Sequence, residues 1–340
     1  MNHALPAPDW HDLAWQAEAH AWIRATLAQH GHQLTGAITQ PHLRPWSTVL
    51  HAPTDAGSYY FKALLPTLSH ELPLTVAITD WLPAYTLQPI AVDAERAWML
   101  LPDGGARLRE QSRADRYTAY WSRVLAAYAE GQIALAAHVP ELLSLGTPDR
   151  RLAQLPQLYA HVLQAVERLD IAADVRLTPA EQQELHRLTP QVAAWCAELA
   201  AWPIPESLHH GDLHDGNIFF NGEQAIFFDW GDASVTHPFM SMRTVFVSVE
   251  ITLDLADGGA VGMPFVDTYL EPWARFASPS VVRKAFQGAQ RLAPIVSALS
   301  WQRVVACLNA EQEREYAGAV AHLLREFLQN ATASTTTERG

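Results

Sequence analysis

The sequence predicts an α+β fold with two lobes: a small N-terminal lobe built on an antiparallel sheet and a larger, mostly helical C-terminal lobe. Three observations predict this organisation. The chain has 340 residues, 49% of them hydrophobic, which is enough for two domains of the usual size of about 100–200 residues. Candidate strands are concentrated before residue 102, whereas helical periodicity dominates from residue 116. The breaker cluster Pro-Asp-Gly-Gly at residues 102–105 separates the two parts.

We therefore divide the chain into three segments. Residues 1–104 form the N-terminal lobe with a leading helix, and residues 105–330 form the helical C-terminal lobe. Residues 331–340 are rich in Thr and Ser and are expected to form a disordered tail.

The N-terminal lobe begins with a helix over residues 10–30, where apolar residues recur at four-residue spacing and Gly31 follows as a stop signal. Residues 46–50 and 58–65 predict a hairpin, because the turn-forming residues 53–57 separate two runs rich in aromatic and β-branched side chains. A second helix is predicted over residues 69–81. Two further strands, 87–92 and 97–101, complete the predicted sheet.

The C-terminal lobe is helical from about residue 116 to 201, with long Ala/Leu-rich segments at 117–137 and 179–200. A β interruption at 208–229 follows, and helical segments return from 240 to 329. We expect the interruption to hold the chemistry, because it carries the densest group of polar motifs in the chain.

Charge and composition exclude several function classes. The formal net charge is −13, so a nucleic-acid backbone would be repelled, and a neutral or cationic small molecule fits better. No stretch approaches the roughly 18 apolar residues of a membrane helix, and the first residues do not resemble a signal peptide. Cys196 and Cys307 are isolated in sequence, which suits a reducing compartment. We expect a soluble, cytoplasmic protein.

The most informative segment runs from His209 to Phe220 and reads HHGDLHDGNIFF; after an Asn-Gly turn it continues as AIFFDWGD. Two short apolar runs around such a turn predict a hairpin. Folding this hairpin brings position 217 opposite position 228, so Asn217 and Asp229 share its open end, with Cα atoms about 5 Å apart. An amide oxygen and a carboxylate at that end are suitable ligands for a hard cation such as Mg²⁺.

Asp212 precedes Asn217 by five residues, in a loop that contains Gly211 and Gly216. These glycines allow the backbone to turn sharply toward the end of the hairpin. A carboxylate placed there can accept a hydroxyl proton, or orient that hydroxyl for in-line attack on a phosphoryl group.

The segments HGDLHDGN and FFDWGD resemble the aminoglycoside phosphotransferase and choline kinase-like family, whose pattern is H-G-D-x-H-x-x-N, then a strand and D-W or D-F-G. The resemblance implies a protein-kinase-like fold and transfer of the γ-phosphoryl group of ATP, or of GTP, to a hydroxyl of a small molecule. It implies Asp212 as catalytic base, Asn217 and Asp229 as Mg²⁺ ligands, and His210 as a brace of the loop.

The N-terminal lobe adds a second part of the same resemblance. Members of the family carry a strand lysine that contacts nucleotide phosphates and a helix glutamate that holds it, and Lys62 and Glu71 occupy the matching places. Lys62 is one of only two lysines in the chain. No G-x-G-x-x-G motif lies between residues 40 and 58, so residues 43–48, with Ser47 as a nucleotide-binding candidate, are left to cover the phosphates.

Two other function classes stay open on the sequence alone. A nucleotide-binding pseudokinase that acts as a sensor is one, although the catalytic Asp and both metal ligands are present. A metal-dependent hydrolase is the other, since His209, His210 and His214 crowd one loop together with Asp215. Asp232 is either a second acid near the metal or a loop cap.

The segment from residue 244 to 274 contains five acids and no Lys or Arg: Glu250, Asp254, Asp257, Asp267 and Glu271. A solvated helix face is the ordinary explanation. In the family that this chain resembles, however, the segment after the metal-binding loop forms much of the acceptor pocket. We therefore hypothesise that the acceptor is cationic, an amino sugar or amino alcohol, and that Glu250, Asp254 and Glu271 contact it.

Overall fold

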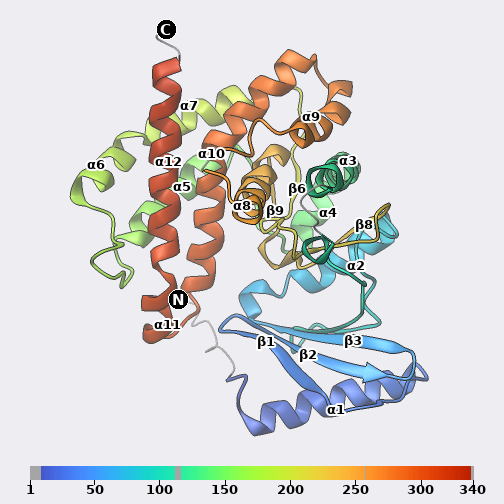
Figure 1. The fold of residues 1–340 in the computed structure, drawn as a ribbon. Coiled ribbons are helices and arrows are strands. Elements are labelled where there is room, and N and C mark those ends of the chain that lie inside the picture. The colour runs from blue at the N-terminus through green and yellow to red at the C-terminus, as the bar shows by residue number, and fades with distance from the viewer. Residues whose placement is uncertain (1–8, 112–115, 257, 338–340) are drawn as a thin grey trace.

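The computed structural model describes residues 9–111, 116–256 and 258–337. It has the two predicted parts, an N-terminal sheet and a helical region above it in Figure 1, and confirms the predicted fold class. The five-stranded sheet is antiparallel and has the order β1-β2-β3-β5-β4. Its strands are β1 (Thr39–Arg44), β2 (Ser47–Thr54), β3 (Gly57–Leu64), β4 (Ala91–Asp93) and β5 (Trp98–Pro102).

Two helices cover opposite faces of this sheet, α1 (Leu13–Gln29) and α2 (Glu71–Trp81). Side chains alternate between the faces of a strand, so Phe61 of β3 packs toward Ile23 of α1, and Leu64 packs toward Leu72 of α2. Figure 1 shows α1 along the side of the sheet that is turned away from the helical lobe. Lys62, between Phe61 and Ala63, therefore faces the helical lobe.

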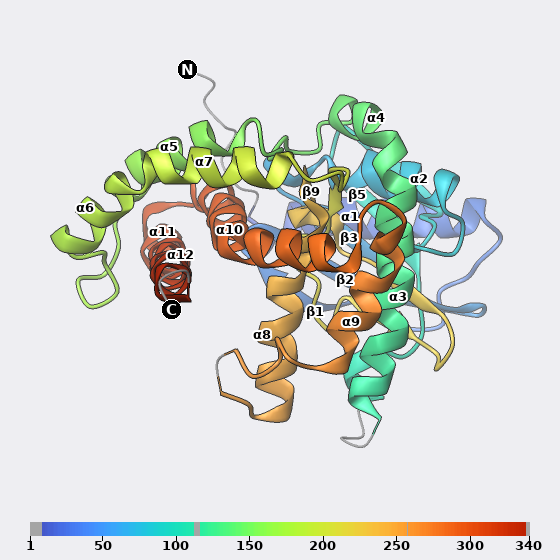
Figure 2. The same cartoon turned by 90° about the horizontal axis from the view of Figure 1, so that it is seen from above.

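The C-terminal lobe packs its helices around one large apolar core. Its helices are α3 (Tyr117–Leu135), α4 (Val139–Ser144), α5 (Leu155–Val166), α6 (Pro179–Arg187), α7 (Thr189–Ala200), α8 (Met242–Leu253), α9 (Pro264–Leu270), α10 (Pro279–Val305), α11 (Ala310–Tyr316) and α12 (Gly318–Thr337). Figure 2 shows α10 running through the middle of this lobe, where it packs against α5, α7 and α12.

Two short antiparallel strand pairs interrupt the helices and hold the polar motifs. They are β6 (Ser207–His209) with β9 (Ser234–Thr236), and β7 (Ile218–Phe220) with β8 (Ala225–Phe227). In the second pair Ile218 lies opposite Phe227, which is the register that the Asn-Gly turn predicts.

The predicted strand 46–50 is longer in the structure, because β2 continues to Thr54 and pairs with Gly57 inside the predicted turn 53–57. Four other elements differ from the sequence-based expectation. The edge strand β1 is not predicted, because Pro41 and an exposed, irregular pattern hide it. The predicted strand 87–92 shortens to β4. The predicted helix 179–200 is two helices, α6 and α7, because Pro190 is suited to a first turn and not to a helix interior.

The fourth difference concerns the tail. The sequence predicts disorder from Ala331, whereas α12 continues to Thr337. A helix that has already formed extends at little cost, and buried Phe327 and Ala331 fix the turns before this end. Residues 338–340 lie outside the described residues.

Residues 103–105 follow β5, the last strand of the five-stranded sheet along the chain, and precede α3. A Cβ on Gly104 would overlap the ring of Phe219 in β7, so this position needs glycine for a close approach. In the described ranges we find no helix that combines the length and the hydropathy needed to cross a membrane.

Candidate active site

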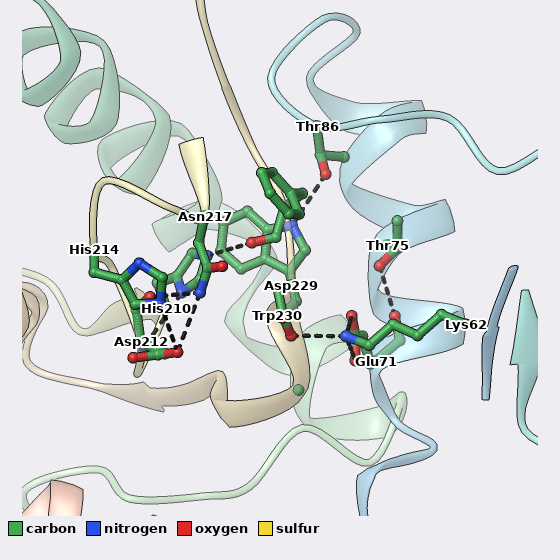
Figure 3. A network of polar contacts seen from close by, with 12 residues as sticks. Lys62, Glu71, Thr75, Thr86, His210, Asp212, His214, Asn217, Asp229 and Trp230 are labelled. Carbon is green, nitrogen blue, oxygen red and sulfur yellow. Dashed lines mark hydrogen bonds and ion pairs between the residues drawn. The ribbon is translucent and has the colours of Figure 1, made fainter. Parts of the chain in front are cut away.

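Three chain segments bring the predicted polar residues together: β3 with α2, the loop 209–217, and the loop 229–232. Figure 3 shows Lys62 and Glu71 on one side, Asp229 between the lobes, and Asp212 with Asn217 and His214 on the other side. The N-terminal lobe thus supplies an ammonium group and a carboxylate, and the C-terminal lobe supplies the other acids.

Lys62 connects the two lobes through its ammonium group. Its Nζ donates to Glu71 Oε1 at 2.7 Å and Oε2 at 2.8 Å, and to Asp229 Oδ1 at 2.7 Å. Lys62 is 8% exposed and Glu71 is 1% exposed. Burial alone would lower the pKa of Lys62, but the two carboxylates outweigh it and raise that pKa above its usual value. The lysine is therefore held charged.

Asp229 has an unusual backbone conformation, with φ of 67° and ψ of 66°, in the left-handed region. Its side chain is 45% exposed, so one carboxylate oxygen reaches Lys62 while the group stays accessible. Burial would raise the pKa of this carboxyl, but the Lys62 ammonium lowers it overall. Asp229 is therefore an ionised oxygen donor.

Glycines let the two polar loops approach each other. Gly211 has φ of 84°, and a Cβ there would overlap the backbone of Asp232. A Cβ on Gly231 would lie 3.0 Å from Glu71 Oε2. The loop that carries Asp212 and the loop that carries Asp229 are thus in backbone contact.

His210 is buried beneath the loop. Its Nε2 lies 2.9 Å from the carbonyl oxygen of Phe228, and its Nδ1 accepts the N–H of Asp212 at 3.3 Å. These partners require a neutral ring protonated on Nε2, and burial lowers the pKa of His210 to about 4. The ring also packs against Trp230, with centroids 4.6 Å apart. His210 thereby joins the Asp212 loop to the strand that precedes Asp229.

Asp212 and Asn217 face each other. The Asn217 Nδ2 donates to the backbone oxygen of Asp212 at 3.0 Å and to its Oδ2 at 3.1 Å. His214 Nε2 lies 3.4 Å from the same carboxylate oxygen. The Asp212 side chain is 44% exposed, so it is oriented by its neighbours and still open to a ligand.

The oxygens of Asn217 and Asp229 suit a magnesium ion. Because the Asn217 amide nitrogen points to Asp212, its Oδ1 is turned away from that carboxylate. The N–H of Phe228 donates to the Asn217 carbonyl at 3.2 Å, which places Asn217 and Asp229 at the same end of the hairpin. An amide oxygen and an ionised carboxylate are hard donors that Mg²⁺ binds, with water and phosphate completing its shell.

Ser47 and Asp232 lie at the margins of this group. Ser47 begins β2 opposite Leu64 and is two residues from Val49, the partner of Lys62, so it lies on the Lys62 face of the sheet. Asp232 packs behind Gly211. Burial, reinforced by Asp212, raises the pKa of Asp232 to about 6.

The acids of the segment 244–274 that the structure describes have separate surroundings. Glu250 accepts the backbone N–H of Ala260 at 3.1 Å, and Asp254 ends α8 in the left-handed conformation. Asp267 pairs with Arg283, and Glu271 is exposed at the start of a short 3₁₀ segment. Asp257 lies outside the described residues. These contacts match a solvated surface more closely than a shared pocket.

The three loop histidines have separate partners. His209 Nδ1 meets Ser241 Oγ at 2.9 Å, and His214 Nδ1 accepts the N–H of Gly216 at 2.9 Å. Asp215 is anchored by Arg109, whose Nη2 lies 2.9 Å from Oδ1. Ring nitrogens already engaged in different directions do not form the ligand set that a metal-dependent hydrolase needs.

Some residues of this site have no local sequence signal. Arg109 lies 106 residues before Asp215, and Tyr117, which donates to Asp215 Oδ2 at 2.9 Å, lies 98 residues before it. Arg303 donates to the carbonyl of Gly231, at 2.8 Å, from 72 residues away. Only the fold brings these partners together.

Comparisons with known proteins give a family and a fold for this chain. A model of a family described as "Phosphotransferase enzyme family" matches residues 47–240. No curated protein sequence matches the chain.

Solved structures share the fold at low identity. A choline kinase from Cryptosporidium parvum is 12% identical, with 94% of this chain and 97% of that chain covered and a TM-score of 0.60. A macrolide 2'-phosphotransferase from Brachybacterium faecium is 18% identical, with 88% and 97% covered and a TM-score of 0.55. An aminoglycoside phosphotransferase from Streptomyces rimosus, in complex with ADP and streptomycin, is 18% identical, with 82% and 98% covered and a TM-score of 0.52.

Proposed function

The chain belongs to the phosphotransferase enzyme family, and we propose that it transfers the γ-phosphoryl group of ATP, or of GTP, to a hydroxyl of a small molecule. The match confirms the family resemblance seen in the sequence motifs. The observation that carries the proposal is the contact of one buried ammonium group, Lys62, with both Glu71 and Asp229, because it joins a phosphate-binding charge to a metal-binding carboxylate.

Each residue has a part in the proposed reaction. Lys62 binds nucleotide phosphate oxygens, with Glu71 holding its ammonium group in place, and Ser47 lies on the same face of the sheet. The proton of the acceptor hydroxyl moves to the Asp212 carboxylate as the hydroxyl oxygen bonds to the γ-phosphorus. The bond from that phosphorus to the β–γ bridging oxygen breaks, and the nucleoside diphosphate leaves with those electrons.

Asn217 and Asp229 are the residues that would hold Mg²⁺, which supplies neutralisation of phosphate charge when bound. Asn217 also orients Asp212, since its amide donates to that carboxylate. His210 keeps the Asp212 loop against the strand before Asp229. Positioning and charge stabilisation supply most of the catalysis in such a site.

The acceptor is the finer part of the proposal. The names of the similar structures mention choline, a macrolide and streptomycin, and those substrates belong to those proteins. For this chain we propose an amine-bearing acceptor, an amino sugar or amino alcohol, on the support of its net charge of −13. Because the described acids of segment 244–274 have separate surroundings, the attraction would be long-range. Glu250, Asp254 and Glu271 remain candidates for attracting the acceptor. A cytoplasmic location of the protein also remains a prediction.

One experiment tests the function directly. Nucleotide binding is measured with and without Mg²⁺, and phosphoryl transfer is then followed over a panel of cationic and neutral hydroxyl acceptors. The proposal expects Mg²⁺-dependent binding and transfer to at least one acceptor. Nucleotide binding without transfer to any member would favour the pseudokinase alternative, whereas an acceptor whose KM ignores salt would contradict the cationic class.

A further inference from the structure

The last turn of α10 contacts both halves of the proposed nucleotide site, although it belongs to the C-terminal lobe. Trp301 meets Trp46 at the turn between β1 and β2. Arg303 meets the loop that carries Asp229. Val304 packs in the apolar cluster of the N-terminal lobe with Leu72 and Met99.

Arg303 holds the loop through its backbone. Its Nη2 donates to the carbonyl oxygen of Gly231 at 2.8 Å, two residues after Asp229. Glu71 is also close to this residue, since a Cβ on Gly231 would be 3.0 Å from its Oε2. The loop therefore lies near Glu71 of the N-terminal lobe and is hydrogen-bonded to Arg303 of α10.

This fixation matters for Asp229 because its backbone is in the left-handed region, at φ of 67°. A residue other than glycine adopts this conformation at a cost, and it persists only where the surroundings impose it. The hydrogen bond to Gly231 acts two residues away, and the Lys62 contact acts on the side chain.

Residues 43–48, the turn that we assign to covering the phosphates, contact the same end of α10. We call this segment the phosphate-covering turn. The ring of Trp46 packs edge-on against Trp301, with centroids 5.6 Å apart, and against Tyr316 of α11 at 5.0 Å. The turn around Trp46 has no glycine, so these aromatic contacts restrict a segment that its backbone does not make flexible.

We propose that Arg303 is a positioning residue, which holds Asp229 in the conformation that accepts the Mg²⁺-nucleotide while Trp301 fixes the phosphate-covering turn from the same turn of α10. This inference rests on the proposed function. Arg303 acts through the loop backbone and needs no contact with substrate.

The test compares Arg303→Met with wild type in calorimetric binding of ADP, over a series of Mg²⁺ concentrations. Loss of the hydrogen bond from a charged donor to a carbonyl oxygen corresponds to a change of about ten- to a hundredfold in an equilibrium constant. We expect the gain in ADP affinity on adding Mg²⁺ to fall by about that factor, with Mg²⁺-free affinity near wild type. Arg291→Met is the matched control, because Arg291 lies on the same helix and stacks on Trp195 instead, 4.6 Å from the ring centroid.

Each outcome decides the inference. An unchanged Mg²⁺-dependent gain in Arg303→Met overturns it, and so does an equal loss in Arg291→Met. Where Arg303→Met fails to fold, Arg303→Gln decides, because its amide keeps a polar group at this half-buried position but is too short to replace the donor at the Gly231 carbonyl: a loss of the Mg²⁺-dependent gain supports the inference, and a wild-type gain overturns it. Wild-type protein without any Mg²⁺-dependent binding of ADP would overturn the proposed function together with the inference, and this separates the two failures.

Discussion

At the scale of single residues, Asp212 carries the proposed proton transfer. In Asp212→Asn the amide keeps the shape of the side chain but cannot take the hydroxyl proton. We expect turnover to fall by about 100- to 10,000-fold, the range typical of a general base, and Mg²⁺-dependent ADP affinity to change little. Steady-state kinetics and calorimetry measure the two effects. Turnover close to wild type would remove Asp212 from its assigned role.

Lys62 and Glu71 form the buried ion pair of the site. Lys62→Arg keeps the charge, but a planar guanidinium does not fit three oxygens within 2.8 Å of one point. We expect the KM for nucleotide to rise.

Glu71→Gln leaves the ammonium with one carboxylate, and we expect the free energy of unfolding to fall by about 1–3 kcal/mol. Because Lys62 and Glu71 touch, the loss of activity in the double variant, expressed as a free energy, should be smaller than the sum of the losses in the two single variants. Strictly additive losses would argue against a functional contact.

Residues of this site differ in how far the sequence can predict them. Asp212, Asn217 and Asp229 stand in one short motif, where spacing and the Asn-Gly turn already determine their neighbours. Arg109 and Arg303 could not be predicted, because each has a hydrogen-bond partner more than 70 residues away in the sequence. In sequence such an arginine looks the same as an arginine on the surface.

At the scale of elements, the close approach of the two polar loops depends on Gly211. Gly211→Ala would place a methyl group against the backbone of Asp232 and would require φ of 84° from an alanine. We expect loss of activity and a fall in the free energy of unfolding well beyond the 1–2 kcal/mol or so that the left-handed conformation alone costs.

Gly222→Ala is the matched control for this substitution. Gly222 has φ of 98°, but nothing lies within 4 Å of the position that the alanine methyl group would take. It should therefore show only the conformational cost, with activity retained. Chemical denaturation and kinetics of both variants separate backbone strain from loop contact; equal effects in the two would mean that the contact at Gly211 contributes nothing.

Elements with a clear period were predictable and irregular ones were not. The hairpin of β2 and β3 has a turn signal between two runs rich in aromatic and β-branched side chains, and the structure contains this hairpin with a tighter turn than predicted, since Thr54 already pairs with Gly57. The edge strand β1 has neither, since its residues are mostly exposed and its pairing with β2 contains an irregularity between Thr39 and His42. Its position is determined by the neighbouring strand and not by its own sequence.

At the scale of the whole molecule, buried histidines predict loss of stability in acid. Burial lowers the pKa to about 3 for three of them and to about 4 for the fourth: His70, His209, His237 and His210. In the unfolded chain the pKa is about 6.5. Below that pH the unfolded state binds protons that the folded state does not, so stability is complete above about 6.5 and falls as the pH drops toward 4.

Two buried carboxyls act in the opposite direction. Burial raises the pKa of Asp232 to about 6, and burial also raises that of Glu71 against the effect of Lys62. These carboxyls bind a proton at a higher pH in the folded state than in the unfolded state. Their contribution to the free energy of unfolding therefore rises as the pH falls through this range. Four histidines outnumber these two acids, and we expect a net decline.

The histidine contribution can be isolated with His237→Asn. Asparagine keeps an acceptor near the position of Nδ1, which meets the N–H of Phe239, and it does not titrate. Between about pH 7.5 and about pH 5 we expect the variant to lose about 2 kcal/mol less than wild type in denaturant unfolding. His322→Asn, at an exposed position, should follow wild type. Parallel curves for all three proteins would contradict the assignment.

The contact of Val304 with the core of the N-terminal lobe also bears on how such genes can recombine. A crossover at residues 103–105 would transfer the whole five-stranded sheet, but it would leave behind the helix end that covers Leu72 and Met99. A chimera that joins this sheet to the helices of a distant relative should therefore inherit an incomplete apolar surface, unless α10 and α11 travel with it. The sheet and the helices that complete its apolar core are thus encoded by separate parts of the gene.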